Sequence, residues 1–185
     1  MNTYKFVEEL NDLRDYFILA DPFTLLDYKK ENNLPDNLIS NFTTTDFGDK
    51  VVEKGKMIAL ARIQNYPYTI CFNLTGKNIE LEKAENNIQI RQDGYLLEVT
   101  QGKICLFTIP YLHKFNLETI ERLLVFRKAQ IEISNGLYSV SILAGQTQQK
   151  YGKEPTLEFV ILPVTEQTQF TAILNTSFSI RNDQY

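Results

Sequence analysis

Four two-residue Xaa-Gly turns punctuate this chain, and each is flanked by residues that favour β-strands. They are Thr75-Gly76, Asp93-Gly94, Gln101-Gly102 and Asn135-Gly136. A tight hairpin turn needs a residue that accepts a positive φ, and glycine does so without steric cost. The turns therefore predict an antiparallel sheet as the main element of the fold.

The register of the predicted hairpins supports this sheet. A two-residue hairpin pairs its flanking residues at fixed positions, so a correct turn brings apolar residues opposite apolar residues. The first three turns do so, since they pair Phe72 with Ile79, Ile90 with Leu97 and Val99 with Ile104. Together with a four-residue connection, they predict a five-strand antiparallel β-meander. Its strands cover residues 68–74, 77–82, 87–92, 95–100 and 103–109, and a further strand at 57–63 opens the region 57–109.

The N-terminal region, residues 1–45, is predicted to be helical. Its apolar residues recur at helical spacing over about residues 4–19, which indicates an amphipathic helix. Asp21-Pro22 then supplies an N-cap followed by proline at the first helical position. A second helix is therefore expected to begin there and to end near residue 32.

A connecting helix and a second β region are expected after the meander. Asn116 can cap a helix near residues 117–128. Asn135-Gly136 predicts a hairpin within a second β region over residues 131–181. The glutamine-rich segment 145–155 is predicted to be an exposed polar loop. Further strands are expected at residues 156–163, 168–174 and 177–181.

These elements predict a mainly β (α+β) fold in a single domain over residues 1–185. A sheet with one apolar face must bury that face, so the meander and the second hairpin region are expected to pack as a sandwich or a partly closed barrel. The strands at 57–63 and 177–181 are expected at sheet edges, where they could pair with another chain. Monomer and dimer both stay open.

Few residues are typical of a catalytic or metal site. His113 is the only histidine, which argues against catalytic triads and multi-histidine metal sites. Cys71 and Cys105 lie four strands apart in the predicted meander, so both are expected to be free thiols. No pair of carboxylates has motif spacing, and no glycine-rich phosphate loop is present. No catalytic residue, cofactor or metal is therefore predicted.

The net charge of −4 is distributed unevenly, because residues 1–50 hold 10 acidic and 5 basic side chains. This balance argues against nucleic-acid binding, which needs a basic surface, and it permits a basic protein partner. The N-terminus lacks the apolar run of a secretory signal, and no stretch approaches the length of a membrane span. A cytoplasmic protein without membrane contact is expected.

Two sets of residues are candidates for binding a partner. Glu8, Asp12 and Asp15 recur at helical spacing opposite the apolar stripe and would form an acidic ridge, with an ordinary solvated face as the alternative. The second set combines residues at an apolar corner of the meander with two residues of the polar loop. For the apolar corner, coverage by a helix is the alternative. The members of the second set are Arg91, Leu96, Phe107, Lys150 and Tyr151.

The absence of catalytic motifs and the acidic N-terminal region predict a non-catalytic protein-binding module, an inhibitor or immunity-type antagonist of a toxin or enzyme. Two alternatives stay open. One is a β-barrel or sandwich that binds a small ligand among its many Phe and Tyr residues. The other is an enzyme that uses carboxylates without a recognisable motif.

Overall fold

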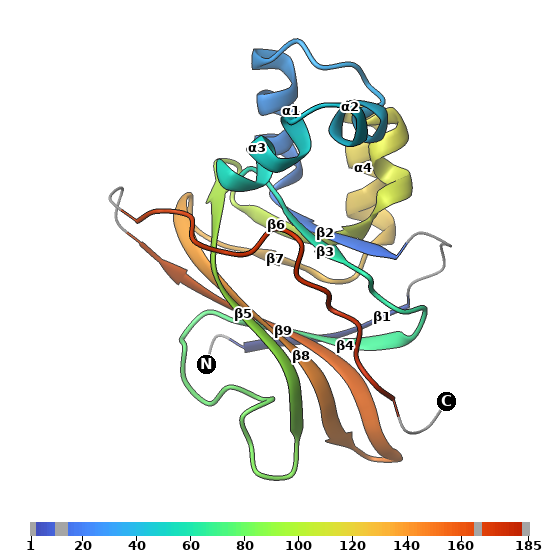
Figure 1. The fold of residues 1–185 in the computed structure, drawn as a ribbon, viewed down its shortest axis with the longest axis vertical. Helices are drawn as coiled ribbons and strands as arrows, with labels where there is room; N and C mark the ends of the chain where they lie inside the picture. The colour runs from blue at the N-terminus through green and yellow to red at the C-terminus, as the bar shows by residue number, and fades with distance from the viewer. Residues whose placement is uncertain (1–2, 10–14, 165–167, 183–185) are drawn as a thin grey trace.

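The computed structural model describes residues 3–9, 15–164 and 168–182, and these form two β-sheets that face each other (Figure 1). Sheet A has five strands in the order β1 (Thr3–Glu9), β4 (Pro67–Asn73), β9 (Gly152–Pro163), β8 (Gly136–Gln149) and β5 (Asn87–Val99). Sheet B has four strands in the order β3 (Ile58–Ala61), β2 (Tyr16–Ala20), β6 (Lys103–Thr108) and β7 (Gln130–Glu132). Neighbouring strands are antiparallel except for β4 and β9, which pair in parallel.

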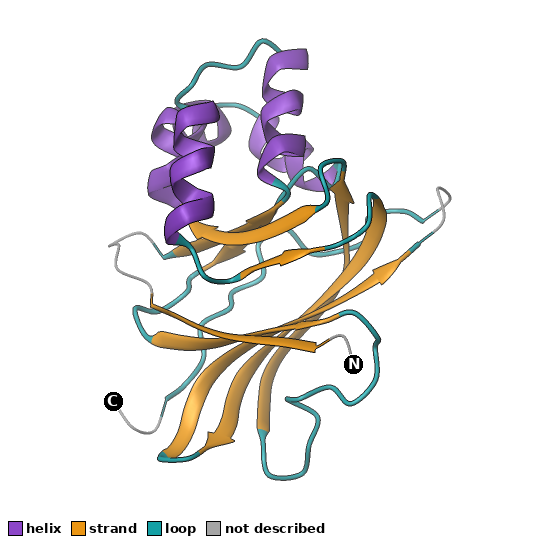
Figure 2. Cartoon of the chain, turned by 180° about the vertical axis from the view of Figure 1, so that it is seen from behind, coloured by secondary structure: helices purple, strands orange, loops and turns teal. Residues whose placement is uncertain are grey.

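Helices cover the outer side of sheet B. They are α1 (Pro22–Glu31), α2 (Leu38–Thr44), α3 (Phe47–Glu53), the 3-10 helix η1 (Ile109–Lys114) and α4 (Leu117–Phe126). Figures 1 and 2 show α1 to α4 at one end of the molecule, so the order of layers is helices, sheet B, sheet A. No helix among the described residues is long and apolar enough to cross a membrane.

The two predicted capped helices are confirmed. The Asp21 carboxylate accepts hydrogen bonds from the backbone N–H groups of Phe23 and Thr24 and begins α1. The Asn116 side chain accepts from the backbone N–H of Thr119 and begins α4. In both cases a polar side chain satisfies N–H groups that lack a partner within the helix. The short helix α2 lies within the region 1–45 that was predicted to be helical, although its bounds were not, and α3 was not predicted.

Aromatic side chains join the two sheets in the core. Phe17 of sheet B meets Tyr68 of sheet A edge to face, with 5.9 Å between ring centroids. Within sheet A, the Phe72 ring lies 5.5 Å from that of Phe159. The four side chains are fully buried. The expected mainly β sandwich is therefore confirmed, and the described strands form two open sheets rather than a closed barrel.

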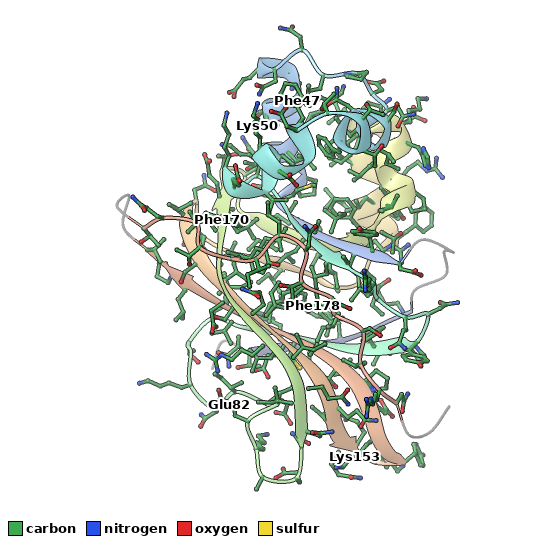
Figure 3. The ribbon with its side chains drawn as sticks, in the orientation of Figure 1. Phe47, Lys50, Glu82, Lys153, Phe170 and Phe178 are labelled. Carbon is green, nitrogen blue, oxygen red and sulfur yellow. The ribbon has the colours of Figure 1, made fainter. Side chains whose placement is uncertain are left out.

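The C-terminal segment, residues 168–182, closes one side of the sandwich. Its Thr171 backbone N–H donates to the carbonyl of Gly94 in β5, and its Phe178 backbone N–H donates to the carbonyl of Ala61 in β3. The segment thus joins the edge strands of the two sheets, and Phe178 is fully buried where it crosses (Figure 3). The predicted strands at 168–174 and 177–181 are wrong, because this segment makes one isolated β-bridge, between Ala61 and Ser177.

The predicted meander over residues 57–109 is wrong. Asp93-Gly94 lies inside β5, which continues through it with a shift of register. Gln101-Gly102 and Asn135-Gly136 carry the chain from one sheet to the other instead of closing hairpins. After a turn, the chain can form the next strand in the same sheet or cross to the facing sheet. Both paths give the same alternation of apolar residues, because both bury the same face in a common core. Register alone cannot separate the two.

The predicted strand at 77–82 is a loop that covers the outer face of sheet A. Glu158 of β9 is fully buried, and its carboxylate accepts from the backbone N–H groups of Glu80 and Leu81, each at 2.9 Å. Leu81 packs with Leu143 and Val160 in a small cluster outside the main core. The apolar residues of this segment therefore reach sheet A without joining it as a strand.

The predicted helix over residues 4–19 is also wrong. The described residues on either side of 10–14 form β1 and β2, which lie in different sheets. The helical stripe rested on few apolar positions, whereas aromatic and β-branched residues such as Tyr4, Val7 and Ile18 favour strands. Pairing with β4 and β6 therefore decided the local structure.

The glutamine-rich loop predicted at 145–155 is the end of the β8–β9 hairpin. The strands pair as far as Gln149 and Gly152, so the connecting turn is short. The strands can contain buried polar residues because the side chains of these residues form hydrogen bonds. The Thr147 and Thr156 hydroxyls lie 2.8 Å apart, and the Gln146 amide donates to Asn182. A polar composition thus concealed a regular strand pair.

Candidate functional site

The predicted acidic ridge does not form, because Glu8 is used by the fold. Its side chain is 8% exposed and accepts hydrogen bonds from Arg127, at 2.8 Å, and from the backbone N–H groups of Lys128 and Ala129. Asp12 lies outside the described residues. Asp15 is exposed just before β2. Glu8 therefore ties the edge strand β1 to the end of α4 and is not available to a partner.

The predicted apolar corner is divided between the two sheets. Leu96 pairs with Ser139 in sheet A, whereas Phe107 pairs with Ile18 in sheet B. The Leu96 side chain is buried, with the backbone of Gly55 packed against it. The ring of buried Phe107 is parallel to that of Phe115, with centroids 6.5 Å apart. Coverage by the helical layer, the alternative interpretation, is correct for both residues.

The other three candidates are exposed. Arg91 forms ion pairs with Glu82 and Asp93 on the surface of sheet A. Lys150 and Tyr151 form the turn of the β8–β9 hairpin, where Tyr151 is 82% exposed. This hairpin tip, near Lys153 in Figure 3, is at the end of the molecule opposite the helices. Arg91 pairs with Leu143 of β8 and not with the residues of the hairpin tip.

The cysteines are buried free thiols, as expected. Burial raises the pKa of Cys105 to about 12. For Cys71, burial together with the nearby Glu158 carboxylate also raises the pKa to about 12. Both groups are therefore neutral thiols at physiological pH, whereas a nucleophilic cysteine needs the thiolate. Among the described residues, no three of the His, Cys, Asp and Glu side chains form a group that could hold a metal ion.

An open pocket of about 400 Å³ lies between η1 and α4. Thr108, at the end of β6, is buried at one side, and η1 follows it directly. The first turns of α4 form the opposite side, and its last residues lead into Arg127. The lining residues are Thr108, Pro110, Tyr111, His113, Lys114, Thr119, Arg122 and Arg127.

Arg127 is held in place by three different contacts. Its Nη1 donates to Glu8, its Nη2 donates to the Thr108 hydroxyl at 3.3 Å, and its guanidinium lies 5.4 Å from the centroid of the Tyr111 ring. Burial lowers the pKa of Arg127 and the Glu8 carboxylate raises it, with a net upward shift. The guanidinium is therefore a permanently charged and well-oriented part of the pocket.

The apolar end of α4 lies beside this pocket. Val125 is 77% exposed and Phe126 is 66% exposed, although Ile120 and Leu123 of the same helix are buried. Phe126 follows Arg122 by four residues, so both lie on one face of α4. We define the α4 surface as Tyr111, His113, Lys114, Thr119, Arg122, Val125, Phe126 and Arg127.

A sequence signal for this surface exists in the run Leu123 to Phe126. Four consecutive apolar residues of a helix are spread around its circumference, so they cannot all face one core. Val125 and Phe126 were nevertheless not among the predicted binding residues.

A second, more apolar pocket of about 240 Å³ lies on the outer face of sheet B, beneath α2 and α3. Ile18 and Ala59 form its base, and Phe42, Val52 and Leu174 are among its walls. It is separate from the core between the sheets.

No protein-family model and no curated protein sequence matches the chain. Two solved structures are similar in shape. One is ComJ from Bacillus subtilis, described as an inhibitor of the DNA-degrading activity of NucA, with 13% identity over 89% of this chain and 96% of ComJ and a TM-score of 0.45. The other is described as crocagin biosynthetic gene J, with 8% identity over 89% of this chain and 98% of that one and a TM-score of 0.49. At these values the likeness carries no argument about what this chain does.

Proposed function

We propose that the protein is a non-catalytic protein-binding module that inhibits a toxin or enzyme, and that the α4 surface is its docking site. The observation that carries the proposal is the exposure of Val125 and Phe126 beside a pocket that contains Tyr111, Arg122 and Arg127. Aromatic residues and arginine are enriched at the centres of protein interfaces, where a few of them provide most of the binding energy.

The rigidity of the α4 surface supports an inhibitory role. Asn116 caps α4, and Ile120 and Leu123 anchor it in the core. Glu8 holds the residues directly after the helix through three hydrogen bonds. A surface that is already ordered loses little conformational entropy on binding, which favours tight occlusion of an enzyme's active site.

The experiment is affinity capture from an extract of the organism that encodes the protein. We expect wild type to capture a protein that Val125→Ser/Phe126→Ser binds at least about 30-fold more weakly, since interface anchors contribute about 2 kcal/mol or more. Added to that purified protein, wild type should inhibit its enzymatic or toxic activity. Both substituted side chains are exposed, so the melting temperature should not change.

Ile173→Ser and Tyr151→Ser are the matched controls, because both remove an exposed apolar or aromatic side chain elsewhere. Ile173→Ser should leave capture unchanged. If Tyr151→Ser abolishes capture and the α4 variant does not, the hairpin tip and not α4 is the docking site. Equal capture by all variants would contradict the proposal.

The apolar pocket favours small-ligand binding as a second candidate function. Its volume of about 240 Å³ and its mainly apolar walls suit a small hydrophobic molecule. The fluorescent probe Nile red tests it. Ala59→Phe would place a ring in the pocket, so we expect probe binding to be lost without a fall in melting temperature, whereas unchanged fluorescence would exclude the pocket as the site.

A further inference from the structure

The pocket between η1 and α4 carries uncompensated positive charge, although the chain as a whole has a net charge of −4. Glu8 partly neutralises Arg127, and Glu118 lies 3.7 Å from Lys114. Within the described parts of the chain, no carboxylate lies within 4 Å of the Arg122 guanidinium. Arg122 is therefore a cation on the pocket rim whose partner is not supplied by these residues.

Hydrogen-bond donors accompany this charge. Arg122 and Thr119 line the α4 side of the pocket, and Tyr111 and His113 line the η1 side. A guanidinium offers two parallel N–H groups that match the two oxygens of a carboxylate, and the hydroxyl groups add further donors. Because Arg127 is already oriented by Glu8 and Thr108, it contributes a fixed positive field and needs no rearrangement.

We infer that this pocket receives the carboxylate of an Asp or Glu side chain of the partner protein, with Arg122 as its main ligand and Val125 and Phe126 as the adjoining apolar contacts. The inference rests on the proposed function, because it names the chemistry that the docking site recognises. The acidic residues of the N-terminal region permit a basic partner, whereas at the α4 surface the partner segment is acidic.

A protein carboxylate fits this site better than a nucleic-acid phosphate. Val125 and Phe126 offer apolar contact area directly beside the pocket. Glu118 and Glu121 are exposed on the same helix and would repel a neighbouring phosphate of an extended polyanion. An isolated acidic side chain with apolar neighbours avoids this repulsion.

The inference is tested by NMR titration of the full chain with defined probes. They are the tripeptide Ac-Leu-Glu-Leu-NH2, its neutral analogue Ac-Leu-Gln-Leu-NH2, inorganic phosphate and a short single-stranded oligonucleotide. We expect the glutamate peptide to shift the resonances of Thr119, Arg122 and Phe126 and to bind at least about tenfold more tightly than the glutamine peptide, because its hydrogen bonds are charge-assisted.

Arg122→Gln should abolish this preference and leave the melting temperature unchanged, because the side chain is exposed. Arg181→Gln, at an exposed position near the C-terminus, is the matched control and should bind like wild type. Equal binding of the two peptides, or no shift at the pocket, would overturn the inference. Tighter binding of phosphate or the oligonucleotide through Arg122 would overturn it in favour of a phosphate ligand.

The outcomes separate this inference from the proposed function. If the Val125→Ser/Phe126→Ser variant loses a captured protein but Arg122→Gln retains it, α4 is the docking site and the carboxylate role is wrong. If the glutamate peptide binds as expected but the serine variant captures the same proteins as wild type, the pocket binds carboxylates and the proposed inhibitory docking is wrong.

Discussion

At the scale of single residues, buried carboxylates hold distant segments of this chain together. Glu8 binds the end of α4, and Glu158 binds the loop over sheet A. Asp21 binds the start of α1 through one oxygen and the backbone N–H groups of Thr100 and Gln101 through the other. Each of the three carboxylates accepts hydrogen bonds from N–H groups of a segment that is distant in the sequence. Their role is therefore structural.

Asp21→Ala is expected to lower the free energy of unfolding by about 3 kcal/mol, because four backbone N–H groups lose a charged acceptor in a buried setting. Urea denaturation measures the change. Asp27→Ala is the control. Its carboxylate is exposed and, among the described residues, pairs only with Lys30, so the substitution should cost less than about 0.5 kcal/mol. Similar losses for the two variants would contradict the role of Asp21.

The two cysteines are expected to be unreactive in the folded protein. Because burial raises the pKa of Cys71 and Cys105 to about 12, the thiolate is scarce at pH 8, and both side chains are at most 1% exposed. The thiol reagent DTNB should therefore label neither residue within minutes in buffer and both residues in concentrated urea. Rapid labelling of the native protein would show that one of the thiols is accessible.

At the scale of elements, local sequence located many strands and two helices but not their partners. The Asn116 cap identified the start of α4 because a helix cap is a local signal. The partners of β5 and β6 are not local, since β5 pairs with β8 and β6 pairs with β2 and β7. The candidate site could not be found from local sequence for the same reason. The sequence places Phe126 in α4, but the exposure of its side chain depends on which residues pack against the helix.

Gly145→Ala is expected to destabilise the β5–β8 pair by about 1–3 kcal/mol or more. A Cβ at residue 145 would lie 2.0 Å from the carbonyl oxygen of Asn87, and a backbone atom cannot move aside cheaply. Thermal unfolding measures the effect. Ser139→Ala, on the same strand, loses only a weak 3.5 Å hydrogen bond and should change stability by less than about 1 kcal/mol. An unchanged melting temperature for Gly145→Ala would refute the close approach of the two strands.

At the scale of the whole molecule, residues 168–182 complete the core from outside both sheets. Their backbone bonds to Gly94 in sheet A and to Ala61 in sheet B, so the segment fastens the two edges together. A side chain at residue 94 would lie 2.3 Å from the Thr171 hydroxyl, which explains a glycine there better than the hairpin turn does. The stability of the sandwich should therefore depend on a segment that lies in neither sheet.

Phe178→Ala is expected to lower the free energy of unfolding by about 3–5 kcal/mol, because it removes a fully buried ring between the two sheet edges. Ile173→Ala removes a side chain of the same segment that is 65% exposed, and it should cost less than about 0.5 kcal/mol. Urea unfolding compares the two. A loss below about 1 kcal/mol for Phe178→Ala would mean that the segment does not close the core.

The sequence by itself determined the mainly β class, the capped starts of α1 and α4, and the strand periodicity, because these depend on neighbouring residues. The tertiary structure alone decided which sheet each strand joins, since a turn within one sheet and a crossing between sheets bury the same apolar face. It also decided the candidate site. Glu8 is removed from the surface by Arg127, which is 119 positions away in the sequence, whereas Phe126 is left on the surface.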